Sequence, residues 1–248
     1  MFFDDEIKKI VIISPHFDDA VLSCAGLIGC FIEEGKTVEI CNVFTKIQKE
    51  NVKFSKVIRE YIAEDMNNPI AYVDMQVCEK WIQLRQKEDD RACKFLNCKK
   101  RDLGYIDAIF RMKSNQYIYD TEEKLFSEYK AHDEEFMKID LINRLNFICK
   151  DFDACLFPMA IGNHVDHRIV HDMGLEINKN WHNVCFYCEI PYSIDPEFQV
   201  LSIEKLNISK LMDLKLKAVG FYGTQLQGLF GTKESISSII PAYEIYAR

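Results

Sequence analysis

Three titratable side chains stand within four consecutive positions early in this sequence, directly after an apolar run. His16, Asp18 and Asp19 follow residues 9–14 (KIVIIS) and Pro15. The run predicts a buried strand, and a helix is expected from residue 19. His16 and Asp19 can then face one point across the strand-to-helix turn. An imidazole and a carboxylate in that arrangement suit a metal such as zinc, and Asp18 remains beside it to accept a proton.

A second polar cluster, the HVDH of residues 164–167, follows another short apolar run, ACLF, and Pro158. Catalytic zinc takes three protein ligands from histidine and carboxylate and keeps a fourth position for water. A histidine from this cluster would complete the set begun by His16 and Asp19. The remaining imidazole, His164, could stabilise an oxyanion and protonate a leaving amine, and Asp166 could orient an imidazole.

Each cluster taken alone also has a structural explanation. Asp19 could merely cap the following helix, and two histidines three residues apart occur by chance on exposed helices. The pairing of both clusters with preceding apolar runs favours a functional site. The other three histidines lack such surroundings and are expected at the surface: His132, His171 and His182.

Strands must alternate with helices to bring the clusters together. Residues 9–14, a helix over 19–34 closed by Gly35, and a strand over 37–44 form one right-handed βαβ unit. Further helices are expected over 78–96, 136–150, from 166 onward and over 209–222, with strands over 154–157 and 184–190 and a loop with a short strand over 99–111. This alternation predicts an α/β fold with a mainly parallel sheet, whose ligands bind at the carboxyl ends of the strands.

We expect one domain over residues 1–248, with a lid-like insertion around 112–135 that covers the site. The polar and aromatic stretch there shows no clear two-fold period.

Composition narrows the function classes. The 248 residues carry a net charge of −8, which argues against nucleic acid as the main partner. The sequence shows no export signal and no apolar run long enough to span a membrane, so a cytoplasmic location is expected. The ten cysteines are expected as reduced, buried residues, including the pair Cys185 and Cys188 in a strand-like run. The first turn, SPHFDD, lacks the glycines of a dinucleotide site, and its charge would repel a pyrophosphate.

At HFDDA and HVDH the sequence resembles the PIG-L family, also called LmbE-like or GlcNAc-PI de-N-acetylase-like proteins, in a His-x-Asp-Asp-Ala subgroup. Phe17 and Ala20 stand where the family's usual motif has proline and glutamate. Supporting stretches occur in order along almost the whole chain: LRQKED (84–89), GYIDAIFR (104–111), YCEIPYS (187–193) and KAVGFYGTQ (217–225).

This resemblance implies a Rossmann-like fold, with helices on both faces of the sheet, and a zinc-dependent N-deacetylase. The enzyme would hydrolyse the N-acetyl group of an amino sugar or related glycoside, with water activated by zinc and Asp18. Another divalent ion such as Fe²⁺ could replace zinc. By position the resemblance assigns every expected site residue: zinc ligands His16, Asp19 and His167; general base Asp18; electrostatic stabiliser or acid His164, with Asp166 as its polar support; substrate contacts Arg85 and Asp107.

Alternatives remain open at this point. An amidase of the same type could act on a bulkier amide such as a thiol-sugar conjugate, in a site shaped by aromatic residues of the insertion: Tyr117, Tyr119, Phe126 and Tyr129. A non-catalytic, metal-stabilised sugar-binding protein would not need Asp18 or His164. Arg85 could be a helix-surface partner of Glu88 or Asp89, and Asp107 a loop cap. The expected partner is a small N-acetylated sugar, and a homo-oligomer is compatible with the sequence.

Overall fold

The computed structural model describes residues 6–49, 53–126, 134–181, 183–194, 203–230 and 236–247. Within these ranges a seven-stranded sheet has the order β3-β2-β1-β6-β7-β9-β8. The first five strands are parallel, β9 is antiparallel to β7, and β8 is antiparallel to β9. The strands are β1 (Lys9–Ser14), β2 (Thr37–Lys46), β3 (Lys99–Ile106), β6 (Ala154–Pro158), β7 (Val184–Tyr187), β8 (Ile203–Asn207) and β9 (Tyr243–Ala247).

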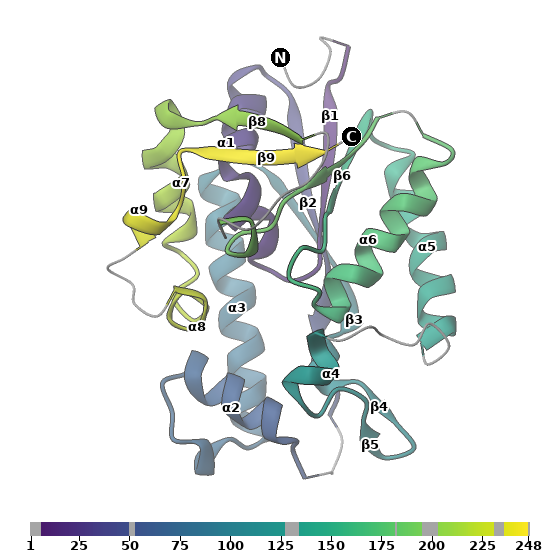
Figure 1. Cartoon of the computed structure of the whole chain (residues 1–248), viewed down its shortest axis with the longest axis vertical. Coiled ribbons are helices and arrows are strands. Elements are labelled where there is room, and N and C mark those ends of the chain that lie inside the picture. Colours follow the sequence, from purple (N-terminus) through teal and green to yellow (C-terminus); the bar gives the residue numbers. More distant parts are fainter. Residues whose placement is uncertain are drawn as a thin grey trace.

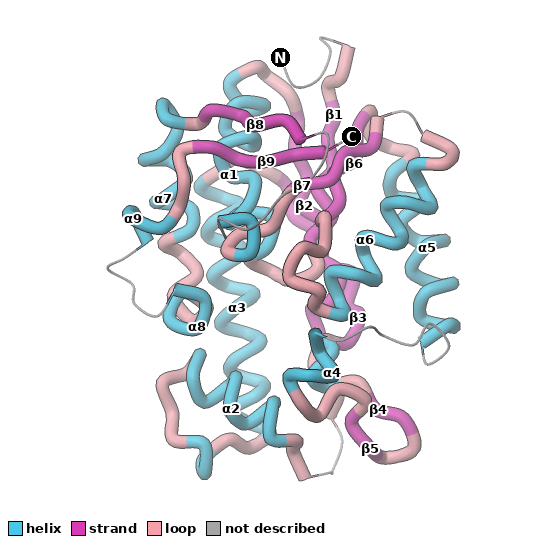
Figure 2. Tube along the Cα trace, in the orientation of Figure 1, coloured by secondary structure: helices cyan, strands magenta, loops and turns pink. Residues whose placement is uncertain are grey.

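Helices cover both faces of this sheet, as Figures 1 and 2 show. One face carries α1 (Asp19–Glu33), α3 (Met75–Phe95) and α7 (Met212–Val219), and the other carries α5 (Glu135–Cys149) and α6 (Val165–Asn178). Four further helices are α2 (Lys56–Asp65), α4 (Glu122–Phe126), α8 (Leu226–Phe230) and α9 (Ile236–Ile239), of which α8 and α9 pack in one apolar cluster with α1 and α7. The expected mainly parallel α/β fold with helices on both faces is confirmed.

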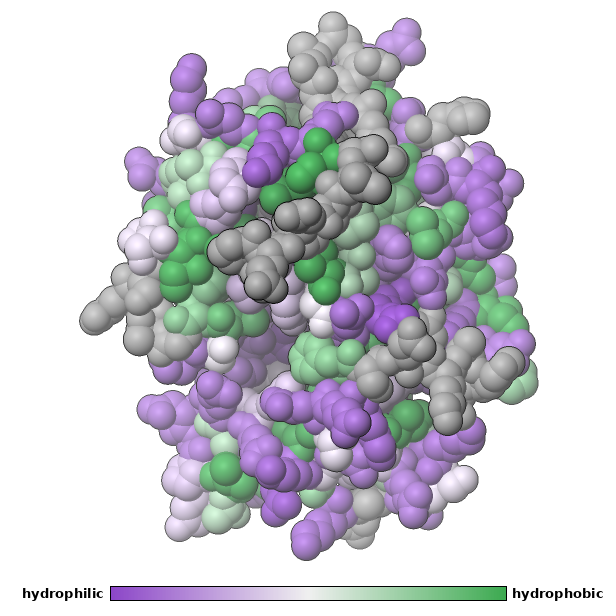
Figure 3. Space-filling view, viewed as in Figure 1, coloured by the Kyte–Doolittle hydropathy of each residue, from purple (hydrophilic) through white to green (hydrophobic). Residues whose placement is uncertain are grey.

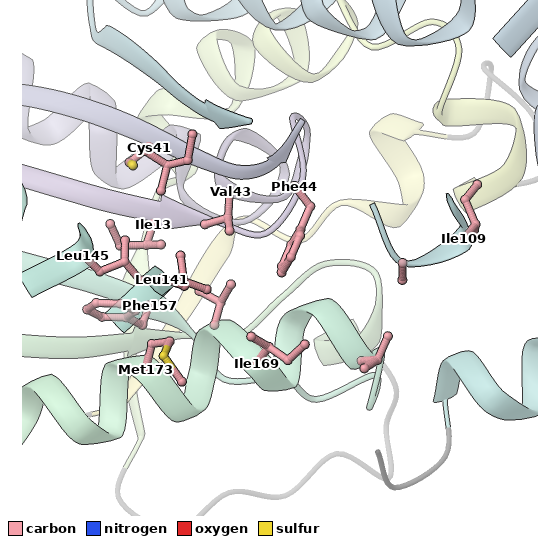
Figure 4. Packing of buried hydrophobic residues seen from close by; sticks show 14 of the residues in the cluster. Ile13, Cys41, Val43, Phe44, Ile109, Leu141, Leu145, Phe157, Ile169 and Met173 are labelled. Atoms are coloured by element: carbon pink, nitrogen blue, oxygen red, sulfur yellow. The ribbon is translucent and has the colours of Figure 1, made fainter. Parts of the chain in front are cut away.

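The two helical layers explain why β1 is apolar at every inner position. Ile10 and Ile12 pack in the cluster that contains α1, whereas Val11 and Ile13 pack in the cluster that contains α5 and α6. Successive strand residues point to opposite faces, so a strand with helices on both sides needs an unbroken apolar run. Figure 4 shows part of the second cluster, with Ile13 and Phe157 of the sheet near side chains of α5 and α6.

One expectation about the strands needs correction. Residues 99–106 form a full strand paired with β2, not a loop with a short strand. This strand lies at the sheet edge and is only partly buried, so its charged sequence hides the pattern of a core strand. The sequence gave no expectation for strands β8 and β9 or for helix α2. Strand β8 is largely exposed, and the buried run of β9 contains the charged residue Glu244, so neither shows the pattern of an apolar core strand.

The segment expected to be a lid begins with a hairpin of β4 (Met112–Lys113) and β5 (Gln116–Tyr117), followed by α4. Figure 1 places α4 and this hairpin beyond the sheet, near the end of β3. Residues 127–133, which include Tyr129, lie outside the described residues. On the face seen in Figure 3, hydrophilic and hydrophobic residues are intermixed. No helix within the described ranges is long and apolar enough to cross a membrane.

Candidate active site

The two polar clusters meet at the carboxyl ends of β1 and β6. These strands are paired neighbours in the sheet, with Ile12 opposite Leu156. The His16 ring therefore lies 5.2 Å from that of His164 and 5.4 Å from that of His167, measured between ring centroids. Parallel pairing thus joins segments about 150 residues apart in the chain.

His16, Asp19 and His167 form the set of donors best suited to a metal. One donor atom from each residue lies within 4.8 Å of the others. The two oxygens of Asp19 are each 3.3 Å from an imidazole nitrogen, Nδ1 of His16 and Nε2 of His167. Burial alone would raise the pKa of Asp19, but the two imidazoles outweigh it and lower that pKa. Two nitrogens and one oxygen, all buried, fit zinc or a similar divalent cation.

A buried carboxylate stands behind each of the two imidazoles. Oδ2 of Asp166 lies 3.1 Å from Nε2 of His16, and Oε1 of Glu189 lies 3.1 Å from Nδ1 of His167. Both carboxylates are completely buried. Burial lowers the pKa of each imidazole, but the neighbouring carboxylates raise it above the usual histidine value. Carboxylates in this position orient histidine ligands and strengthen them, which supports the fit of a metal.

Glu189 was not expected from the sequence. It follows β7, the strand next to β6, and therefore reaches the same edge of the sheet as the two polar clusters. Its Oε1 also accepts a hydrogen bond from the backbone N–H of Ala160 at 2.7 Å. An acidic residue directly after an apolar strand was the available signal, and it stood within the stretch YCEIPYS.

Asp166 contacts a different imidazole from the one expected. Its carboxylate binds His16, Nη2 of Arg111 at 2.5 Å and the backbone N–H of Ala108 at 3.0 Å. His164 instead accepts, at Nδ1, the backbone N–H of Asp166 at 3.2 Å. The donor atoms of His16, His164 and Asp166 also come within metal-binding reach of one another. Because Arg111 already neutralises Asp166, we regard the trio with Asp19 as the better cation site.

Asp18 and Arg85 form a buried ion pair beside the metal donors. Nη2 of Arg85 lies 3.0 Å from Oδ1 of Asp18, and Arg85 is only 6% exposed. Burial raises the pKa of Asp18, and the guanidinium offsets only part of that rise. The interpretation of Arg85 as a surface partner of Glu88 or Asp89 is wrong, since helix α3 turns this side chain into the site.

Asp107 lies at the site and also caps a helix. Its Oδ1 accepts the backbone N–H of Ile109 at 3.2 Å, at the start of a 3-10 helix over Ala108–Phe110. Its Oδ2 lies 3.9 Å from Nε2 of His16. The loop-cap expectation is therefore confirmed, and the same carboxylate faces the site.

These groups open into a pocket of about 390 Å³. Beyond the site residues, the pocket wall contains aromatic rings and acidic side chains: Tyr61, Trp81, Phe126, Tyr192, Glu64, Asp65 and Glu122. Of the insertion aromatics, Phe126 reaches the pocket, and its ring lies 5.3 Å from that of His164. Tyr119 instead donates to Glu134 at 2.8 Å.

The remaining histidines and cysteines lie apart from this chemistry. His171 is half-buried, with Nδ1 2.9 Å from the carbonyl oxygen of Pro158, whereas His132 and His182 lie outside the described residues. All ten cysteines of the chain are described and are free thiols, with Cys185 and Cys188 buried.

The chain is similar to known proteins in sequence and in fold. The family model PIG-L, described as GlcNAc-PI de-N-acetylase, matches residues 11–178. A 2'-N-acetylparomamine deacetylase of Niallia circulans is 30% identical, over 96% of this chain and 90% of the relative. One of Streptomyces fradiae is 23% identical, over 88% and 73%. The zinc-inhibited form of teicoplanin deacetylase shares the fold, with a TM-score of 0.79 at 20% identity, covering 96% of this chain and 97% of that one.

Proposed function

Since the chain belongs to the PIG-L family, we propose that it is a metal-dependent N-deacetylase that hydrolyses the N-acetyl group of an amino sugar glycoside. One observation carries this proposal: two imidazoles and a carboxylate converge within metal-binding distance, and a second carboxylate, that of Asp18, lies beside them. The activity of the paromamine relatives supports the same reaction class.

In this proposal His16, Asp19 and His167 hold the cation, which is zinc or another divalent ion such as Fe²⁺. The bound cation would polarise the amide carbonyl and lower the pKa of a water molecule. Asp166 and Glu189 hold the two imidazoles in orientation through their second ring nitrogens. The protein thereby keeps the three donors in place before substrate arrives.

Asp18 is the general base in this mechanism. Its Oδ1 is held by Arg85, and it lines the pocket together with the metal donors. It takes a proton from the attacking water, and it can return that proton to the amine when the carbon–nitrogen bond breaks. Arg85 acts here by positioning the carboxylate; its expected direct contact with substrate remains part of the proposal, as does that of Asp107.

His164 stabilises the negative charge that develops on the amide oxygen. Because its Nδ1 accepts the backbone N–H of Asp166, the neutral ring carries its proton on Nε2. His164 lines the pocket, so this N–H is available to an oxyanion.

The acidic wall of the pocket indicates the character of the substrate. Glu64, Asp65 and Glu122 add negative charge to a cavity that also offers aromatic rings. Sugars that bear several amino groups are cationic at neutral pH and suit such a wall. Glu122 and Phe126 belong to the 112–135 segment, so we propose that this segment closes over the sugar as a lid in the single domain.

The test is acetate release from a panel of N-acetylated sugars, comprising N-acetylated aminoglycosides, free N-acetylglucosamine, nucleotide- and lipid-linked forms and bulkier acyl amides. Protein stripped with a chelator and protein reloaded with zinc or Fe²⁺ are compared. We expect acetate and free amine in equal amounts, with the amine-rich glycosides preferred and activity restored on reloading. Equal activity in the stripped protein would contradict metal dependence. Release of only a bulkier acid would favour the amidase alternative.

A further inference from the structure

Helix α5 carries apolar side chains on two opposite faces. The inner face packs in the core through Leu141 and Leu145, which are fully buried. The outer face presents Phe136 at 90% exposure, Phe147 at 72% and Ile139 at 51%. A surface helix of a globular protein normally turns charged and polar residues to water on that side. Figure 1 places α5 at the edge of the molecule, on the outer side of α6, so the second apolar face points away from the core.

The exposed side chains form one stripe along the helix. Phe136 and Phe147 are separated by about three helical turns, so their side chains point the same way. Asp140 and Asn143 lie between them on this face, and both are exposed. Steps of four, three and four residues join these four positions, which is the spacing by which two helices pack side by side. We call these four residues and Ile139 the outer stripe.

The order of residues in the outer stripe suits a second copy of the same stripe that runs in the opposite direction. A two-fold axis between two copies then places Phe136 of each copy against Phe147 of the other, and Asp140 against Asn143. The amide of Asn143 can donate to the carboxylate of Asp140, and this contact forms twice. Parallel packing would instead set Asp140 of one copy against Asp140 of the other, and the two like charges would repel.

The ends of α5 favour the same direction. Glu135 stands at the start of the helix and Lys150 directly after its end, and both are exposed. Antiparallel packing brings Glu135 of one copy near Lys150 of the other and sets the two helix dipoles head to tail. Among the described residues, none of α5 lines the pocket that contains the metal donors, so this packing leaves the pocket open.

We propose that the outer stripe of α5 is a homodimer interface, in which the stripes of two copies pack antiparallel about a two-fold axis. The self-complementary order of apolar and polar residues along an exposed stripe carries this proposal. One helix face is smaller than a standard interface of about 800 Å² per partner, so we expect a dissociation constant in the micromolar range. The proposal does not depend on the reaction that the enzyme performs, and each can fail without the other.

Sedimentation equilibrium of the full chain over about 1 to 200 µM tests the dimer. The wild-type mass should approach twice the 29.0 kDa of one chain as the concentration rises. Phe136→Lys and Phe147→Glu each remove an apolar contact that occurs twice per dimer, so each should weaken association at least about 100-fold. Both side chains are exposed, so the fold should be unaffected, which thermal unfolding at low concentration checks. The matched control is Tyr72→Lys, which removes an aromatic side chain of 71% exposure outside α5 and should leave the dimer intact.

Mixing the two weakened variants tests the direction of packing. In an antiparallel dimer, the lysine introduced by Phe136→Lys faces the glutamate introduced by Phe147→Glu, and the other pair of phenylalanines is kept. Association should therefore recover to within about tenfold of wild type, and native mass spectrometry should detect one copy of each variant per dimer. In a parallel dimer the two introduced charges would not face each other. Absence of recovery would contradict the antiparallel arrangement.

Other results would overturn the dimer interface itself. One is a wild-type protein that stays monomeric over the whole concentration range. Another is a dissociation constant that neither Phe136→Lys nor Phe147→Glu changes, which would place the interface elsewhere. Equal weakening by Tyr72→Lys would show that the effect is not specific to α5. A monomeric wild type that binds phosphatidylcholine vesicles, with loss of that binding in Phe136→Lys, would assign the outer stripe to a membrane surface instead.

Discussion

Oε1 of Glu189 lies 3.1 Å from Nδ1 of His167, 22 residues away in the chain and completely buried. Because Nδ1 faces this carboxylate, Nε2 of the same ring is left to face Asp19 at 3.3 Å. The contact thus decides which nitrogen of His167 is available to a metal. The same relationship holds between Asp166 and His16 on the other side of the site.

Replacing Glu189 should weaken metal binding without removing a ligand. In Glu189→Gln the neutral amide is a poorer acceptor for the Nδ1–H of His167, so we expect zinc affinity to fall about 10- to 100-fold. Competition with a chromophoric chelator measures this without any substrate. Glu176→Gln, which changes an exposed carboxylate on α6, is the control. Equal zinc affinity in the two variants would show that Glu189 does not support the metal ligand.

Asp18→Asn should stop turnover while the metal stays bound. The amide keeps the size of the carboxylate but cannot take a proton from water, so kcat should fall by about 10² to 10⁴. Acetate release and metal content are measured on the same sample. Full turnover with zinc still bound would rule out Asp18 as the base.

Substrate binding should depend on pH through Asp65. Burial raises the pKa of Asp65 to about 6, against the opposing effects of Arg85 and of the hydrogen bond from Trp81. The carboxyl is charged above that pH and neutral below it, so a cationic sugar loses one partner as the pH falls. KM for an amine-bearing substrate should rise as the pH falls from about 7 to about 5.

The variant Asp65→Asn and an uncharged substrate separate this effect from others. Asp65→Asn should raise KM at pH 7 and remove this part of its pH dependence. An N-acetylated sugar without free amines should show no such rise in KM with the wild-type protein. A rise in KM that persists unchanged in Asp65→Asn would assign the pH effect to another group.

The stability of the fold should depend on Glu244 in β9. Its carboxylate accepts Nζ of Lys215 at 2.6 Å and the backbone N–H groups of Gly26 and Leu27 in α1, and both charged residues are fully buried. Glu244→Gln leaves a buried ammonium without its counter-charge, so the free energy of unfolding should fall by about 3–5 kcal/mol.

Denaturant unfolding measures this loss, with Glu79→Gln as the control. Glu79 pairs with Lys49 at the surface, and its replacement should change the free energy of unfolding by less than about 1 kcal/mol. A loss of similar size in the two variants would mean that burial adds nothing to the Lys215–Glu244 pair.

The sequence alone determined those parts of the site that are formed by residues close to one another in the chain. The apolar run before Pro15 predicted β1 at its observed bounds, and the polar residues after it predicted the start of α1 at Asp19. Alternation of strands and helices predicted a parallel sheet, and such a sheet brings the ends of β1 and β6 to one edge. Local periodicity and chain connectivity were sufficient for these inferences.

The tertiary structure decided which distant side chains meet. Glu189 behind His167, Asp166 on His16 instead of His164, and Arg85 on Asp18 all join segments at least 22 residues apart. Tyr192 over Gly162 depends likewise on how the loop after β7 packs. The spacing of residues in the sequence does not predict such contacts. They depend on strand register, helix rotation and side-chain packing, which are set only when the whole core forms.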